Sequence, residues 1–283
     1  MSAAEITERE RRWATPAATL AILAVILVAV WQVILATGFS ADGKAEYLRE
    51  IDGDSGAFVL AFVIRALGAA LLAVPLVYLF RAVEARNERA RSQLIGLMIA
   101  GPLFLAAFAV FEGLSLKDAA SDFVARGILG SGDRADDVAQ NVLEGAATRD
   151  VAAGFGIAGA LGFAIAMTYT CYQAMQVGLL TRFWGALGAA LGAVSIFFFQ
   201  FTLLWFIYLG LLIGGWVPKG RPPAWAAGEA VPWPTPGEHA ARSLEREQGE
   251  AGDEPAAGAG EGEAPEAEDT QPPGERRKRK RRS

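Results

Sequence analysis

Residues Ala57–Phe80 read AFVLAFVIRALGAALLAVPLVYLF, a run of 24 residues in which Arg65 is the only charged side chain. At 1.5 Å rise per residue, a helix of this length crosses a hydrocarbon core of about 30 Å. Lipid offers the backbone no hydrogen-bond partners, so a run that faces lipid must be helical. The stretch therefore predicts a membrane-spanning helix.

Three further apolar runs have the same character and lie at 16–38, 93–113 and 151–178. Pro16 suits the first turn of its helix, where the missing N–H leaves no hydrogen bond unmade. The chain is 53% apolar, and apart from Arg65 and Glu112 its charged residues lie between the runs rather than within them. This distribution excludes an ordinary soluble fold and predicts an all-α, polytopic bundle of transmembrane helices.

The last apolar run, Trp184–Trp216, is ambiguous. Its 33 residues would form one strongly tilted helix of about 50 Å, or two short helices at 184–199 and 201–217. Only Gln200 and Thr202 offer polar atoms to a tight reversal. Local signals leave the number of spans at five or six.

Charges in the loops favour six spans. The segment Arg81–Ser92 holds four basic residues in twelve, whereas segments 39–56 and 114–150 are acidic. The positive-inside rule therefore places Arg81–Ser92 and the N-terminus (1–15) in the cytoplasm, and a final hairpin would keep the basic C-terminus there too. A bacterial inner (plasma) membrane is the expected location.

The outer loop and the C-terminal tail have contrasting compositions. The extracytoplasmic loop 114–150 is predicted to contain two amphipathic helices, Lys117–Arg126 and Asp133–Leu143, which we expect to cap the bundle rather than to form a lid. Residues 218–283 are rich in Pro and Trp, then acidic, then polybasic, and are predicted to be a disordered cytoplasmic tail. Trp225 and Trp233 are expected at the headgroup level.

Arg65 is the most informative intramembrane residue, because it lies about 12 Å from the outer boundary and needs a partner there. Counting along antiparallel helices places Glu112 within its reach, which predicts an Arg65–Glu112 ion pair. Pinning of two helices is the favoured role, and an outward-facing polar cavity is the alternative. Gln32 is an isolated polar residue that can join either arrangement.

A second polar face lies in the fourth run, where Tyr169, Tyr172, Gln173 and Gln176 share one side of a helix. Hydrogen bonding between helices is its favoured role, and a lining for a half-channel is the alternative. Small-residue stripes, at Gly188 and Gly192 and at every fourth position of 152–164, predict close helix contacts and a homo-oligomer. The G-x-G-x-x-G pattern at 154–159 follows no strand, so it does not indicate dinucleotide binding.

The C-terminus carries seven consecutive basic residues, Arg276, Arg277, Lys278, Arg279, Lys280, Arg281 and Arg282. They are expected either to be a solvated, topology-setting end or to contact anionic lipids or a cytoplasmic protein. Nucleic acid is disfavoured as a partner, because no folded or aromatic surface accompanies the run.

Chemistry-bearing residues are sparse. Cys171 and His239 are the only cysteine and histidine in the chain, so multi-cysteine or His-ligated metal sites and a Ser/His/Asp triad have no material, and no catalytic, cofactor or metal residue is predicted. The expected function is non-enzymatic: a membrane scaffold or interaction protein with a polybasic tail. The alternative is a small-solute transporter or channel that uses the polar intramembrane face.

The segment Gln173–Gly185, and Gly220–Trp225 followed by Pro232–Pro234, resemble a group of uncharacterised multi-pass bacterial integral membrane proteins of the actinobacterial type. The resemblance extends from about Phe58 to Pro236 and includes the basic end. It implies six spans, because relatives of this type turn in the middle of the last apolar run, although this chain has Phe and Gln there in place of Pro or Gly. It assigns no activity and no site residues.

Overall fold

The computed structural model divides the chain into two units, Met1–Trp233 and Pro234–Ser283. Every described residue except Pro234 lies in the first unit. The described residues are 2–88, 90–128, 130, 132–146, 148–197, 199–218 and 220–234.

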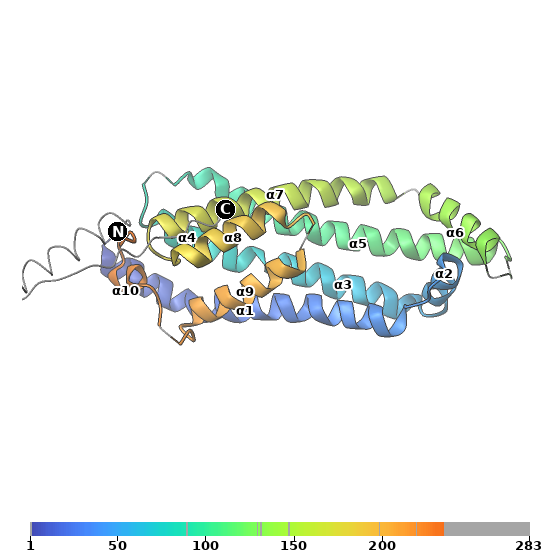
Figure 1. Ribbon diagram of the computed structural model, residues 1–283, viewed down its shortest axis with the longest axis horizontal. Helices are drawn as coiled ribbons and strands as arrows, with labels where there is room; N and C mark the ends of the chain where they lie inside the picture. The colour runs from blue at the N-terminus through green and yellow to red at the C-terminus, as the bar shows by residue number, and fades with distance from the viewer. Residues whose placement is uncertain are drawn as a thin grey trace, which may run out of the picture. The chain divides into compact units, whose positions relative to one another are not determined.

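All the secondary-structure elements of the described residues are helical (Figure 1). In chain order they are α1 (Ala3–Gly38), α2 (Lys44–Gly53), α3 (Ser55–Leu71), α4 (Ala73–Glu84), the 3-10 turn η1 (Ser92–Leu94), α5 (Ile95–Ala125), α6 (Asp133–Gly145), α7 (Arg149–Gln176), α8 (Arg182–Val194), α9 (Phe199–Gly214) and α10 (Pro223–Ala227).

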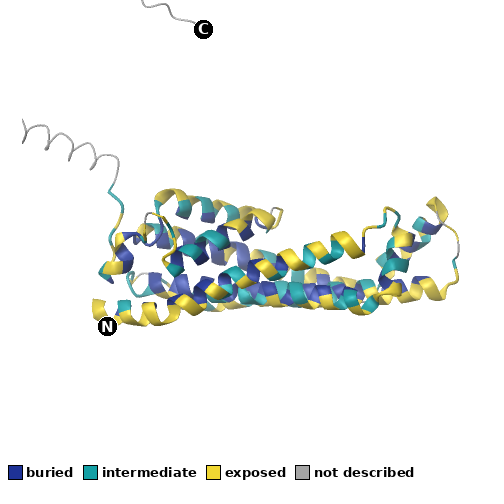
Figure 2. Cartoon of the chain, turned by 90° about the horizontal axis from the view of Figure 1, so that it is seen from below, coloured by how far each residue is buried: buried dark blue, intermediate teal, exposed yellow. Residues whose placement is uncertain are grey.

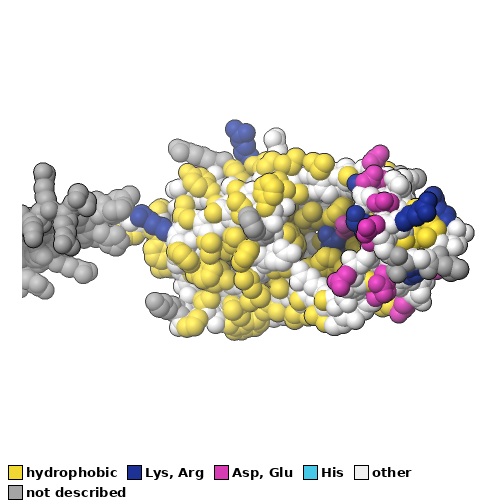
Figure 3. All heavy atoms as spheres, turned by 45° about the vertical axis from the view of Figure 1, so that its right-hand side comes forward, with side chains coloured by type: hydrophobic (Ala, Val, Ile, Leu, Met, Phe, Trp, Pro, Cys, Tyr) yellow, Lys and Arg dark blue, Asp and Glu magenta, His cyan; other side chains and the backbone are white. Residues whose placement is uncertain are grey.

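Four helical segments are long and apolar enough to cross a membrane: Ala3–Gly38, Ser55–Glu84, Ser92–Ala125 and Arg149–Gln176. They run side by side in alternating directions (Figure 1). We call the end with the N-terminus and the α4–α5 loop the proximal end, and the end with α2 and α6 the distal end. Burial is concentrated inside the bundle (Figure 2), while an apolar belt covers the face in Figure 3 and acidic side chains gather at the distal end. The predicted all-α bundle is confirmed.

Helix α1 begins earlier than expected. Ser2 and Glu5 form a capping box, in which the Ser2 hydroxyl accepts from the Glu5 N–H (3.3 Å) and the Glu5 carboxylate accepts from the Ser2 N–H (2.7 Å). This cap satisfies the first N–H groups and starts the helix 13 residues before Pro16. The prediction that Pro16 occupies the first turn is therefore wrong, and the proline lies inside a continuous helix.

The second apolar run is interrupted. Pro75 has no N–H to donate to the Leu71 carbonyl, so α3 ends at Leu71 and a turn at Leu72 precedes α4. At this turn the Leu72 N–H donates to the carbonyl three residues back, that of Ala69 (3.2 Å), rather than four residues back as in an α-helix. The run 57–80 is thus two helices in one membrane-length segment.

The distal end is more helical than expected. Helix α5 runs on to Ala125, so the separate helix predicted at 117–126 is wrong, because no breaker stands between it and the apolar run. Helix α6 lies where the second amphipathic helix was predicted, and α2 was not predicted. The Ala45 N–H donates to Asp136 (2.8 Å), and Arg49 donates to the Ile128 carbonyl (2.9 Å), which fastens α2 to α6 and to the loop before it.

The last apolar run reverses direction. Helices α8 and α9 contain 13 and 16 residues, about 20 and 24 Å, so the hairpin reaches only part of the way along the 28-residue α7 (Figure 1). At its tip the Ser195 hydroxyl donates to the Gly192 carbonyl (2.8 Å), and the Ser195 N–H donates to the same carbonyl (3.3 Å). The reversal agrees with the hairpin prediction. Six full crossings are not confirmed, because α8 and α9 are both shorter than a membrane span.

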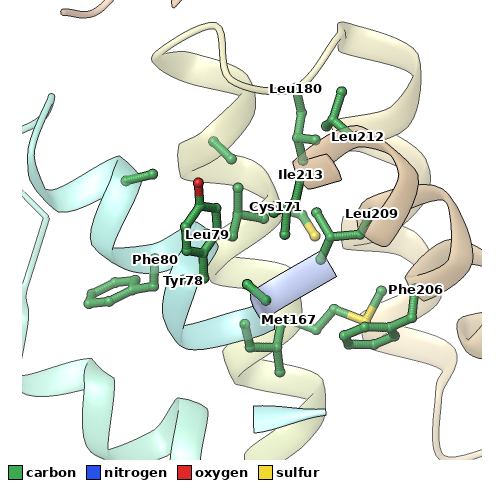
Figure 4. Close-up of a cluster of buried hydrophobic side chains, with 14 of the residues drawn as sticks. Tyr78, Leu79, Phe80, Met167, Cys171, Leu180, Phe206, Leu209, Leu212 and Ile213 are labelled. Atoms are coloured by element: carbon green, nitrogen blue, oxygen red, sulfur yellow. The ribbon is translucent and has the colours of Figure 1, made fainter. Parts of the chain in front are cut away.

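The hairpin packs tightly on its neighbours at the proximal end. Its side chains join α4 and α7 in a buried cluster, of which Figure 4 shows Leu79, Met167, Cys171, Phe206 and Leu209. Within the hairpin, the Trp205 indole donates to the Trp184 carbonyl (3.1 Å), and the rings of Trp184 and Tyr208 stack with their centroids 3.6 Å apart. A shared apolar core therefore holds the hairpin to the bundle.

The chain after α9 returns to the bundle, which corrects the prediction that disorder begins at residue 218. Trp225 is 5% exposed, and its indole donates to the Leu179 carbonyl (2.9 Å). Trp233 donates likewise to the Leu180 carbonyl (2.8 Å), so neither indole needs the headgroup layer. Gly178 permits this approach: its φ is +78°, and a Cβ there would lie 2.0 Å from the Val231 carbonyl oxygen.

Candidate functional site at the hairpin tip

The structure contains the ion pair expected between α3 and α5. Arg65 contacts the Glu112 carboxylate through Nη1, and the two side chains are 22% and 33% exposed. Arg65 lies ten residues into α3, and Glu112 lies nearer the distal end, so the arginine side chain extends in that direction. The predicted register of the two helices produces this contact.

Aromatic rings surround the guanidinium group. Its Cζ lies 4.3 Å from the centroid of the Trp31 ring, 5.1 Å from that of Phe108 and 5.7 Å from that of Phe62. Cation–π attraction of this kind gains strength where water is excluded. Three helices thus hold the charge in one place.

A cavity of about 440 Å³ lies beside Arg65, where the hairpin tip ends short of the distal end. Figure 3 shows a hollow in the apolar face, with a basic side chain within it. Arg65 is the only lysine or arginine among the described lining residues. Helices α1, α3, α5 and α7 form its walls, and the turn between α8 and α9 closes its proximal side. The half-length hairpin is therefore what creates the space.

The cavity combines apolar walls with a few polar groups. Apart from Arg65, its polar lining comes from Gln32, Ser195 and Gln200, while Trp31 contributes ring surface. The Trp31 Nε1 is buried and has no hydrogen-bond partner among the described residues. A buried donor without a partner costs free energy until an acceptor reaches it. The arrangement suits a ligand with an apolar body and an acceptor group.

The polar face of α7 does not contribute to this cavity. Tyr169 accepts from the Arg91 N–H (3.4 Å), and Gln173 accepts from the Asn87 side chain (3.0 Å), both in the α4–α5 loop at the proximal end. Tyr172 and Gln176 are exposed. The four residues therefore serve in part to fasten a loop, and the structure does not bring them to Arg65 or Gln32.

The predicted small-residue contacts are made within the chain. A Cβ at Gly188 would lie 2.7 Å from the Cys171 Sγ, and one at Gly192 would lie 2.8 Å from the Thr168 Oγ1, so both glycines face α7. Gly156 faces the ring of Phe108 and lines the cavity. The glycines of α8 are therefore already covered by their own chain, and the predicted homo-oligomer stays a prediction.

Sequence reasoning missed the contributions of Trp31 and Ser195, and a buried ion pair at the proximal end. The Arg86 side chain is fully buried and binds both carboxylate oxygens of Glu10, one of them at 2.9 Å. The signal for this pair is weak, because both residues lie in charged segments that read as exposed ends. Trp31 lies in an apolar run, where nothing in the sequence singles it out.

Several predictions concern residues outside the described part of the chain. The residues concerned are His239 and the polybasic run Arg276–Arg282, which lie outside the described residues. The lipid or partner contact of the tail therefore stays a prediction. Within the described residues, no group of three or more His, Cys, Asp or Glu side chains could hold a metal ion.

Comparison of the chain with protein-family models, with curated proteins and with solved structures gives no match. The resemblance to a bacterial membrane protein family therefore stays a prediction.

Proposed function

We propose that the chain is a multi-pass, non-enzymatic protein of a bacterial inner membrane, with its N-terminus in the cytoplasm, that binds a small amphiphilic organic anion in the hairpin-tip cavity and conducts it across the membrane. The observation that carries the proposal is the position of Arg65 in a cavity left by a half-length hairpin. A charge at this depth costs about 2.5–3.5 kcal/mol on insertion scales, which makes it a functional candidate by default.

The lining supports binding rather than acid–base catalysis. Arg65 is the only titratable side chain among the described residues that line the cavity. The volume of about 440 Å³ lies within the range of about 300–1,000 Å³ typical of small-molecule sites. Aromatic walls suit an apolar body, and the Arg65 guanidinium suits a carboxylate.

The ion pair gives the site a mechanism of exchange. An incoming carboxylate would compete with Glu112 for the guanidinium of Arg65, and Glu112 would recover the arginine when the solute leaves. Such an exchange keeps the buried cation paired at every stage, which avoids the cost of an isolated charge. Substitution of Arg65 should then lower the affinity for the carboxylate, and substitution of Glu112 should raise it. If the two residues only pinned their helices together, the two substitutions would not have opposite effects on affinity.

The test uses purified full-length protein in neutral detergent and measures the melting temperature with a panel of carboxylates from benzoate to decanoate, with their uncharged amides as controls. We expect carboxylates to raise the melting temperature, Arg65→Gln to abolish the rise, and Glu112→Gln to enlarge it. Uptake of the best carboxylate into proteoliposomes then measures transport. Equal responses of the two variants, or a panel without any stabilising carboxylate, would refute the proposal.

A matched pair of substitutions tests the cavity itself. Ala160→Phe fills it, whereas Ala158→Phe places the same side chain on an exposed position of the same helix, outside the lining. We expect only Ala160→Phe to remove binding. Deletion of residues 235–283 should leave binding intact, whereas it should abolish the function of a scaffold that works through its tail.

A further inference from the structure

The hairpin-tip cavity opens on the side of the bundle. Helix α9 packs on α1 and α8 packs on α7, so the hairpin fills the space between α1 and α7 in the proximal half (Figure 1). Beyond the hairpin tip this space is the cavity, and Figure 3 shows a hollow within a largely hydrophobic face. A ligand can therefore reach the cavity from the surface that faces lipid.

The exposed part of the cavity lining is mainly apolar. Four of the described lining residues are exposed, and we call them the rim: Ala153 and Ile157 of α7, and Ile196 and Gln200 at the hairpin tip. Ile157 and Ile196 are 64% and 48% exposed, so they belong both to the cavity wall and to the outer surface. A rim with one amide and no charge suits contact with lipid better than contact with water.

The rim lies at the depth of the distal leaflet. Ile157 is eight residues, or about 12 Å, from Arg149, the first residue of α7 at the distal end. Half of a hydrocarbon core of about 30 Å is about 15 Å. The rim thus lies within the apolar part of one leaflet, where the chain of a lipid can reach it.

Charge and apolar surface lie at different levels of the cavity. Arg65 is the only charged residue among the described lining residues, and its side chain extends toward Glu112 at the distal side. Ala69, one turn nearer the proximal end, and Phe163 are 5% and 0% exposed and form apolar wall. A carboxylate at Arg65 therefore has apolar surface on its proximal side, and this surface continues to the rim.

We propose that the ligand is a long-chain fatty acid that enters from the distal leaflet, with its carboxylate at Arg65 and its alkyl chain leaving the cavity over Ile157 and Ile196 into the lipid. This inference rests on the carboxylate site proposed above and adds the source and the chain length of the ligand. Outside the rim the chain meets further exposed apolar side chains, Leu161 of α7 (49%) and Phe197 of the hairpin tip (79%). The chain is not enclosed, so the cavity volume of about 440 Å³ does not limit its length.

Photo-crosslinking in phosphatidylcholine vesicles that contain the full-length protein tests this proposal. The probe is palmitate with a diazirine in the middle of its chain, and the readout is the labelled residue, identified by peptide sequencing. We expect labelling at or next to Ile157 and Ile196, and its loss in Arg65→Gln. Oleamide, which has the chain of oleate without the charge, should not compete with the probe.

The chain length of the competitor shows whether the chain is enclosed. Decanoate, myristate and oleate should compete equally, within about twofold per mole of lipid, because each added methylene has apolar surroundings both in the free and in the bound state. An enclosed chain would instead exclude oleate, whose extended chain is longer than that of decanoate. Competition by oleate about tenfold weaker than by decanoate would overturn the proposal.

A matched pair of substitutions tests the rim. Ile157→Trp narrows it and should remove most of the labelling. Ile165→Trp is the control, because Ile165 lies about two turns further along α7, is 55% exposed and is outside the lining. Equal labelling of the two variants would overturn the proposal. So would the absence of labelling at the rim in a protein that benzoate stabilises, whereas failure of the carboxylate site itself would leave the melting temperature unchanged by benzoate and decanoate alike.

Discussion

Replacement of Arg86 by Gln should lower the stability of the proximal end of the bundle. We expect a larger loss of stability than from neutralising one member of the Arg65–Glu112 pair. The arginine contacts Glu10 on α1, and it donates to the Ala82 carbonyl (2.9 Å) within its own segment. It also donates through Nε (3.1 Å) and Nη2 (3.0 Å) to the Ala224 carbonyl in α10. One side chain therefore joins three segments that lie far apart in the sequence.

The magnitude follows from burial. The side chains of Arg86 and Glu10 are 0% and 7% exposed, so neither charge has water to replace its partner. Removal of one member of a buried pair costs about 3–5 kcal/mol, because the other charge stays buried without compensation. Glu10→Gln with Arg86→Gln leaves no uncompensated charge and should cost less than the sum of the two single changes.

The assay is equilibrium unfolding of the purified protein in mixed micelles, together with limited proteolysis between residues 216 and 222. Loss of the contacts to Ala224 should expose that segment to the protease before the bundle unfolds. Arg11→Gln is the control, because the Glu8–Arg11 pair is exposed and contributes little. If Arg86→Gln changed stability and cleavage no more than the control does, the argument from burial would fail.

Three further changes have defined outcomes. Gly188→Leu should lower the melting temperature sharply because its side chain would collide with Cys171, whereas Gly154→Leu should not, because a Cβ at Gly154 would have no neighbour within 4 Å. Trp225→Phe should cost about 1 kcal/mol in chemical unfolding, since it removes the hydrogen bond to the Leu179 carbonyl and retains most of the buried ring. Burial, with smaller effects of nearby carboxylates, raises the pKa of Tyr47 above its usual value of about 10. Stability should therefore be intact below about pH 10 and decline as the pH rises toward the pKa of the folded state, and Tyr47→Phe should reduce that decline in a pH-dependent thermal melt.

The membrane-length helices could be predicted from the sequence because hydrophobic length is a local property. The helix boundaries that differ from expectation lie where the sequence carries a local signal of its own. The capping box Ser2–Glu5 is visible as Ser-x-x-Glu, and it starts α1 before Pro16. Pro75 indicates the break between α3 and α4. Apolar residues three apart, at Ala45, Leu48 and Ile51, indicate the amphipathic helix α2.

The candidate site could be predicted only in part. Arg65 and Glu112 are related by counting residues along antiparallel helices, which the sequence allows. The position of Trp31 over the guanidinium depends on the rotation of α1 about its own axis, which packing decides. The short hairpin depends on packing as well, because its turn at Ser195 lacks Pro or Gly, while Gly192 at the end of α8 packs closely against Thr168 of α7.

The burial of Cys171 has a practical consequence. Its side chain is 0% exposed beneath Gly188, and it is the only thiol in the chain. A membrane-impermeant maleimide should leave the folded wild-type protein unlabelled, so the natural sequence already serves as a background for site-directed labelling. A cysteine introduced at Ser2, and another introduced at Asp52, would then report the side of the membrane on which each end of the bundle lies. Labelling of Cys171 itself would report loss of the folded state.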